Sequence, residues 1–214
     1  MKSSSRPVAV LGLASLALAC LLLGGTARAQ APAVGGDAYS HLVAQSEAAD
    51  PGTDFRALRF AWLDSAAHRT ASDPSAAQKA MHDAAGRTDN AAVRSAAERV
   101  IAAHYTDLEA HMMRRLACVA LKDDACATHE HFVEFGMLKS ILDSGDGKTP
   151  DTAWHVASIE EEYFVMQIAQ VSLKQQALVS QNGRAFDHLT VTTADGTDKA
   201  MWFDITDFFG KELG

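Results

Sequence analysis

Histidine and glutamate residues gather in the middle of the chain, between positions 104 and 134. His131 and Glu134 lie three positions apart, about one helical turn, so both side chains can face one site. His111 lies upstream, on a separate helical segment that can pack beside them. Metal sites in helical bundles use acid and histidine pairs of this kind, which suggests a zinc site at His111, His131 and Glu134. The alternative is packed, hydrogen-bonded histidines, since no HExxH motif is present.

Three consecutive acids, Glu160, Glu161 and Glu162, form a second group that can do chemistry. A carboxyl group held in a pocket can act as a general acid or base, which makes Glu161 and Glu162 candidate catalytic residues. Adjacent residues of a helix point in different directions, so at most one or two of these acids can face a pocket. A solvated helix N-terminus, which favours negative charge, explains the same run without catalysis.

A glycine-rich turn is predicted between these two groups. Its centre consists of Gly145, Asp146, Gly147 and Lys148. The Gly-Lys-Thr run does not make a phosphate-binding loop, because the glycine required five residues before Gly147 is replaced by Leu142. Asp143, Asp146 and Asp151 offer oxygens for calcium, but the EF-hand spacing is absent and aspartates commonly stabilise turns. We interpret this turn as a structural joint.

The N-terminus has the pattern of a secretory signal peptide. Lys2 and Arg6 precede an almost wholly apolar run, and Ala27-Arg28-Ala29 matches a signal peptidase site. We therefore expect residues 1–29 to be removed by cleavage after Ala29, which leaves a small-residue linker over 30–36 and places the protein in the periplasm or outside the cell. The alternative is an uncleaved membrane anchor, because the apolar run is nearly long enough to span a bilayer. The sequence around Cys20 is a poor lipidation signal.

The net charge narrows the choice of partners. Residues 1–29 contain three basic residues and no acidic ones, so their removal changes the net charge from −8 to −11. An acidic protein without a long basic cluster is poorly suited to bind nucleic acid or anionic lipid. We expect neither partner, and no insertion into a membrane after cleavage.

Two cysteines remain after cleavage, Cys118 and Cys126. They lie on either side of a predicted turn at Lys122-Asp123-Asp124, where neighbouring helices can bring them together. An oxidising compartment favours a disulfide between them. The alternative is two separate buried thiols, which behave as small apolar side chains.

Helical periodicity extends over residues 37–145. Short helices are expected first, and three stronger ones then begin near Asp89, Thr106 and Asp123, joined by short connections that favour antiparallel hairpins of tetratricopeptide-like form. For the last of these helices we expect one apolar face. That face contains Phe132, Phe135, Leu138 and Leu142, with Ile141 beside it.

The region 146–214 has a mixed pattern. We expect a strand over 153–158, a helix over 159–171 and two hairpins, with turns at Asn182-Gly183 and Asp195-Gly196. Alternation in the last strands places five apolar side chains on one face: Leu189, Val191, Met201, Phe203 and Ile205. The fold class is therefore α+β. Helical hairpins precede a small antiparallel sheet with one helix, and the two regions pack as one globular unit.

The chain resembles the Domain of Unknown Function 4919 family in three stretches. The stretches that match its signature are Ser140–Pro150, Thr152-Ala153 and Glu161-Glu162-Tyr163. The segment Asp50–Phe55 and the closing Trp202–Ile205 are similar to its ends. This resemblance implies an exported bacterial protein with a helical half and a small sheet, and no established activity. It marks as positions of interest the 145–148 turn, His111, and either His129 or His131.

From these observations we expect a non-enzymatic protein-interaction module whose partner is an envelope protein. The series of helices joined by short turns motivates this hypothesis. The sequence contains no complete set of catalytic residues that would contradict it. The alternative is a metal-dependent hydrolase that uses His111, His131 and Glu134, with Glu161 or Glu162 as the base. We expect no cofactor, and zinc enters only with the hydrolase alternative.

Overall fold

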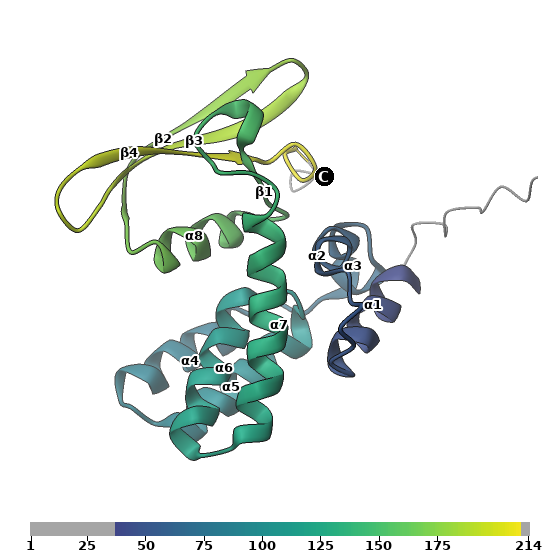
Figure 1. Cartoon of the computed structure of the whole chain (residues 1–214). Helices are drawn as coiled ribbons and strands as arrows, with labels where there is room; N and C mark the ends of the chain where they lie inside the picture. The colour runs from purple at the N-terminus through teal and green to yellow at the C-terminus, as the bar shows by residue number, and fades with distance from the viewer. Residues whose placement is uncertain (1–36, 211–214) are drawn as a thin grey trace, which may run out of the picture. The chain divides into compact units, whose positions relative to one another are not determined.

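The computed structural model describes residues 37–210. The predicted signal peptide, its cleavage site and the 30–36 linker lie outside these residues. In chain order the elements are α1 (Asp37–Glu47), α2 (Phe55–Leu63), α3 (Ala66–Thr70), α4 (Ser75–Gly86), α5 (Asn90–Ala103), α6 (Leu108–Leu121), α7 (Asp124–Leu142), a 3-10 turn (Pro150–Thr152), β1 (Trp154–His155), α8 (Ile159–Ile168), β2 (Ser172–Gln181), β3 (Arg184–Thr192) and β4 (Asp198–Asp204) (Figure 1). No helix within 37–210 combines the length and apolar character needed to cross a membrane.

The α+β class is confirmed, and the helices pack as hairpins. Helix α4 packs on α5, α5 on α6, and α6 on α7. Six of the helices begin at a residue whose side chain accepts a hydrogen bond from a backbone N–H three positions later. These cap residues are Asp54, Ser65, Asp89, Asp107, Asp123 and Ser158. Local sequence therefore fixes where most helices start.

The apolar face predicted for α7 is confirmed only in part: Ile141 is buried, and Phe132 and Leu138 pack partly buried against the core. Phe135 is 53 % exposed and Leu142 is also exposed, whereas Val133, Met137 and Ile141 are fully buried together with two glutamates of the same helix. Apolar residues surround α7 on most sides, so periodicity alone does not select a face. The face of α7 that is buried is the one whose two glutamates form ion pairs with arginines of α6.

The sheet has the strand order β1-β4-β3-β2. Its antiparallel hairpins are confirmed, and Asn182 and Gly183 have the positive φ values of 53° and 75° that the predicted turn requires. The expected first strand is reduced to Trp154–His155, and it runs parallel to β4, so the sheet is mixed rather than antiparallel. This parallel pairing arises because the 145–152 segment lies against β4, where the Gly147 carbonyl accepts from the Trp202 N–H.

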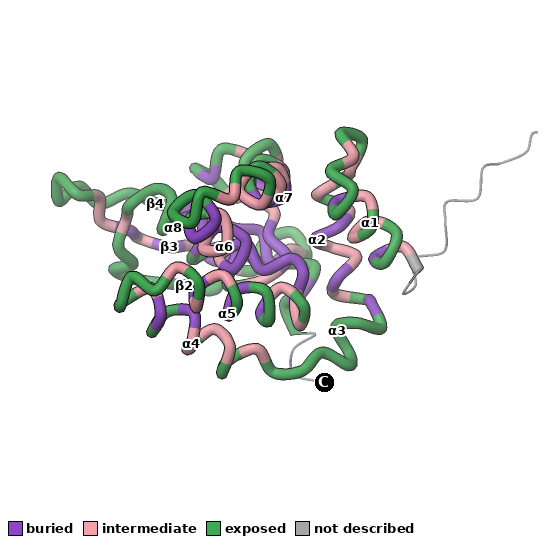
Figure 2. Tube along the Cα trace, turned by 90° about the horizontal axis from the view of Figure 1, so that it is seen from below, coloured by how far each residue is buried: buried purple, intermediate pink, exposed green. Residues whose placement is uncertain are grey.

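One large hydrophobic cluster contains residues from both the helices and the sheet. The sequence predicted that five apolar side chains at the end of the chain share one face of the sheet. All five are buried in this cluster, together with Trp62, Met137 and Phe164. A second cluster consists mainly of alanines, with Met81, Val93 and Val100, and joins α4, α5 and α6 (Figure 2). Small side chains allow these three helices to approach closely.

Candidate functional site

Two neighbouring cavities among the described residues share part of their lining. Their volumes are about 210 and 690 Å³, and His104, Ser158 and Glu160 line both. We call this continuous surface the His104 groove. It is bounded by the end of α2, the α5–α6 connection and the start of α8. The groove therefore depends on packing between elements that are far apart in the sequence.

One wall of the groove is a stack of rings. His104 follows the last turn of α5, and its ring lies parallel to Trp62, with centroids 4.5 Å apart. The His68 ring also contacts the Trp62 indole, with the two ring centroids 5.0 Å apart. Burial lowers the pKa of His104, although the charges of Asp107 and Glu160 oppose that shift. His104 is therefore a neutral, flat contact surface at neutral pH.

The smaller cavity is acidic. Asp107 caps α6 and accepts a hydrogen bond from Gln78, while Glu109 lies 3.5 Å from His82. Burial raises the pKa of Glu109, and the charge of His82 opposes the shift. Glu160 is exposed, and no hydrogen bond or ion pair joins its carboxylate to another residue in 37–210. No lysine or arginine in that range lines this cavity, so it presents an unbalanced negative charge.

The three adjacent acids of α8 point in different directions, as the sequence predicts. Glu160 faces the groove. Glu161 is buried, where it pairs with Arg59 at 2.5 Å and accepts from the Ala157 N–H at 2.7 Å. Glu162 is buried against the sheet, and its pKa is raised to about 9 by burial and by the charge and hydrogen bond of Asp187. A catalytic role for Glu161 or Glu162 remains a prediction. Of these two, Glu161 is the one that lines the groove.

Arg59 is a buried charged residue beside the groove whose partner could not be identified from the sequence. Its side chain is fully buried, donates to Ser140 Oγ at 2.9 Å, and pairs with Glu161. It thereby joins α2, α7 and α8. The available signal was its place between Leu58 and Trp62 on an apolar stripe, because a charge on a buried face needs a buried partner.

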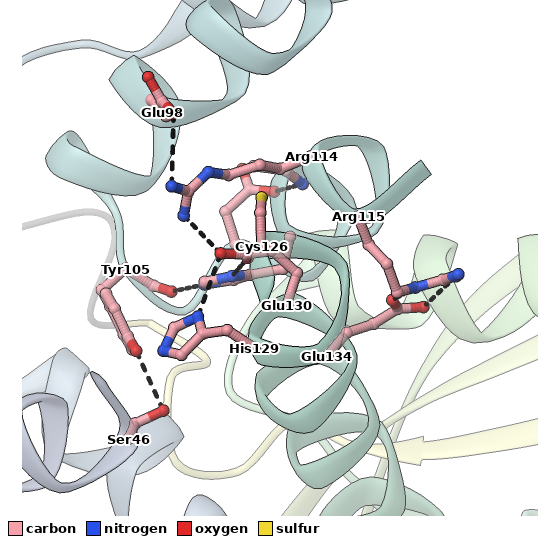
Figure 3. A network of polar contacts seen from close by, with 12 residues as sticks. Ser46, Glu98, Tyr105, Arg114, Arg115, Cys126, His129, Glu130 and Glu134 are labelled. Carbon is pink, nitrogen blue, oxygen red and sulfur yellow. Dashed lines mark hydrogen bonds and ion pairs between the residues drawn. The ribbon is translucent and has the colours of Figure 1, made fainter. Parts of the chain in front are cut away.

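A second polar network joins α6 to α7 (Figure 3). His111 is buried, with Nδ1 2.6 Å from Glu130 Oε2 and Nε2 2.7 Å from the Tyr105 carbonyl. Arg114 also contacts Glu130, and His129 lies 3.3 Å from the same carboxylate. Burial opposes ionisation of Glu130, but His111 and Arg114 outweigh it and lower its pKa. Both nitrogens of His111 are thus in contact with atoms of the protein itself.

The structure does not bring the three proposed zinc ligands together. Glu134 pairs with Arg115 at 2.5 Å, and the exposed His131 stacks on Phe135. Within 37–210, one group of three potential ligand residues has its ligand atoms within 4.8 Å of one another, and it consists of Cys118, Asp123 and Cys126. The two cysteines of that group are bonded to each other. The metal site at His111, His131 and Glu134 remains an untested prediction without support from geometry.

The predicted disulfide between Cys118 and Cys126 is formed and joins α6 to α7. We expect the double variant Cys118→Ala with Cys126→Ala to lose about 2–3 kcal/mol of unfolding free energy, because the open chain regains loop entropy. Urea titration measures this loss. A reducing agent should destabilise the wild type by a similar amount and leave the double variant unchanged; equal sensitivity of both proteins would contradict this account.

The 145–148 turn is held by hydrogen bonds within its own segment. Asp146 accepts hydrogen bonds from Thr152 Oγ1, from Lys148 Nζ and from the Lys148 N–H, which together lower its pKa to about 2. The carboxylate oxygens are thus engaged within the turn. Asp143 likewise pairs with Lys139. These contacts explain the local aspartates without calcium.

Gly147 cannot be replaced without strain. Its φ is +64°, and an added Cβ would lie 2.5 Å from the Trp154 ring. We expect Gly147→Ala to lower the unfolding free energy by about 2–4 kcal/mol through backbone strain and overpacking. Gly183→Ala is the control, because its φ is +75° but nothing lies within 4 Å of the added Cβ. Equal losses in thermal unfolding of the two variants would show that packing at Gly147 contributes nothing.

A further polar cluster joins β1 to β4. His155 contacts the Asp204 carboxylate through Nε2. The other ring nitrogen of His155, Nδ1, lies 2.8 Å from the Arg56 guanidinium. Arg184 also pairs with Asp204, at 2.5 Å. Burial opposes ionisation of Asp204, but the hydrogen bonds of His155, Thr206 and Arg184 outweigh it and hold its pKa well below the ordinary range. The sequence gives no signal for this cluster, because its members come from four separate segments.

Comparisons with known proteins give one match. Residues 52–212 match the family described as "Domain of unknown function (DUF4919)". Searches of curated proteins and of solved structures found no match.

Proposed function

The chain belongs to the DUF4919 family, which brings no established activity with it, and we propose that it is a non-enzymatic binding module whose His104 groove holds a basic, extended segment of a partner protein. The observation that carries this proposal is the exposed Glu160 carboxylate, which lies where the two cavities meet and has no ion-pair partner among the described residues. A lysine or arginine side chain is the group best suited to balance it.

The remaining groove surfaces fit such a ligand. The smaller cavity, with Asp107 and Glu109 beside Glu160, is acidic and has room for one side chain. The larger cavity is lined by Trp62 and His104 and also by one cation, Arg69, and one further acid, Asp73. The basic side chain is therefore placed in the smaller cavity, and the larger one holds the neighbouring part of the chain. The flat His104 ring adds a face on which a guanidinium group can stack.

The compartment and the partner are part of the same proposal. The N-terminal 29 residues support export to the periplasm or outside the cell, where the partner would be an envelope protein. The predicted acidity of the mature chain supports a basic ligand over nucleic acid or an anionic membrane. The hydrolase alternative lacks this kind of support, because its three ligands are separated.

Binding of short peptides tests the proposal. We expect a lysine- and arginine-containing peptide to bind, measured by calorimetry, and a glutamate-containing peptide of the same length not to bind. Glu160→Gln should weaken binding by about 10-fold or more, since a charge-assisted contact contributes about 1.5–3 kcal/mol. Asp151→Asn removes an exposed acid outside the groove and is the control. Equal affinities for the two peptides, or no effect of Glu160→Gln, would contradict the proposal.

A further inference from the structure

Strand β2 forms one edge of the sheet and is hydrogen-bonded to β3 alone. It is ten residues long, whereas the opposite edge strand, β1, has two residues. Its residues are exposed or half-buried along its whole length (Figure 2). An edge strand presents a row of backbone donors and acceptors that another strand can use.

The register identifies which backbone groups are free. Gln181 and Arg184 flank the two-residue turn and form a hydrogen-bonded pair, so alternate residues of β2, such as Val179 and Ala177, also bond to β3. The residues between them direct their N–H and C=O groups away from the sheet. These are Gln176, Leu178 and Ser180.

This edge lacks the usual protection against pairing. Edge strands are commonly guarded by charges, by proline or by a bulge. In β2 the single charge is Lys174, and the register shift lies between Leu173 and Gln175, both at the start of the strand. The segment 175–181 has neither charge nor proline. Leu178, at its centre, is 53 % exposed.

We propose that β2 pairs antiparallel with β2 of a second copy of this chain, about a two-fold axis at Leu178. In this register Leu178 lies opposite Leu178 of the second copy, Ala177 opposite Val179, and Gln176 opposite Ser180. Apolar side chains thus meet apolar ones, polar meet polar, and no like charges are opposed. The free N–H and C=O groups of three residues on each copy are satisfied.

The self-complementary sequence favours a second copy over an unrelated peptide. An interface on a two-fold axis requires a surface that matches itself, and 176–180 does so about its central residue. The net charge of −8 opposes association at long range. Added salt should therefore tighten the dimer, because it screens this repulsion, whereas it should weaken binding of a basic peptide in the groove.

Sedimentation velocity of the purified protein over a range of concentrations tests the proposal. We expect a concentration-dependent doubling of mass, and Leu178→Lys should weaken the dimer by about 10-fold or more, because it places like charges opposite each other. Leu116→Lys is the matched control, since Leu116 is 48 % exposed on α6. Unchanged thermal unfolding of both variants shows that the loss is not a folding defect.

Amide hydrogen exchange tests the register independently. The amides of Gln176, Leu178 and Ser180 should become protected as the protein concentration rises, and this protection should disappear in Leu178→Lys. A protein that stays monomeric at all concentrations would overturn the proposal and leave the edge to a different partner. A dimer that Leu178→Lys does not weaken, or concentration-independent exchange of these amides, would also overturn it.

Discussion

Replacing Glu162 with glutamine is expected to raise the free energy of unfolding, and the gain should grow as the pH rises. Glu162 is 1 % exposed, and its Oε1 has no hydrogen-bond partner among the described residues. Burial and the neighbouring Asp187 raise its pKa to about 9, from an ordinary value of 4.5. The folded protein therefore keeps this carboxyl protonated at neutral pH, whereas the unfolded chain ionises it.

The direction of the pH dependence follows from the proton count. Between pH 4.5 and about 9, the folded state holds a proton at Glu162 that the unfolded state has lost. The contribution of Glu162 to stability is thus fully present below pH 4.5 and falls by about 1.4 kcal/mol per pH unit above it. Glutamine has no proton to lose, and its amide can still donate to Asp187.

Urea titrations of both proteins between pH 5 and pH 8 measure this effect. The advantage of Glu162→Gln should be small at pH 5 and about 3 kcal/mol at pH 7. Glu160→Gln, an exposed substitution on the same helical turn, is the control and should change stability by about 0.5 kcal/mol or less. Parallel pH profiles for wild type and Glu162→Gln would show that Glu162 is ionised in the folded state.

The variant Arg59→Met is expected to lower the free energy of unfolding by about 3–5 kcal/mol, because it leaves the buried Glu161 carboxylate without its charged partner. The Arg59 side chain is completely buried and also donates to Ser140 Oγ. Methionine fills much of the same volume, so the loss comes mainly from the charge. Urea titration at neutral pH measures it.

A double-mutant cycle separates the ion pair from packing. Arg59→Met combined with Glu161→Gln should be more stable than the sum of the two single losses predicts, because no buried charge is left unpaired. Arg87→Met, at an exposed arginine that follows α4, is the control. Strict additivity of the two single effects would mean that the Arg59–Glu161 contact contributes no coupling energy.

Local signals account for much of the fold. Cap residues such as Asp107 and Ser158 start helices because their side chains bind nearby N–H groups, and Asn182-Gly183 sets the β2–β3 register because the turn needs positive φ. The Cys118–Cys126 bond was also predictable, since only a short turn separates the two helix ends. Each of these features depends on residues within about ten positions of each other.

Contacts between distant segments were less predictable. The apolar face predicted for α7 included Phe135 and Leu142, and both proved exposed. His111 and Glu134, proposed as partners in one site, bind Glu130 and Arg115 separately. Helical spacing states which residues of one helix share a side, but it does not state which side meets the neighbouring helix.

The sequence by itself determined the α+β class, the starts of the three main helices and the disulfide, because each follows from backbone preferences or short-range contacts. The tertiary structure alone decided the His104 groove, the Arg59–Glu161 pair and the protonated state of Glu162. These features require side chains from separate elements to meet, and the pKa of a carboxyl group depends on the burial and charges around it. Neither quantity is defined until the chain has packed.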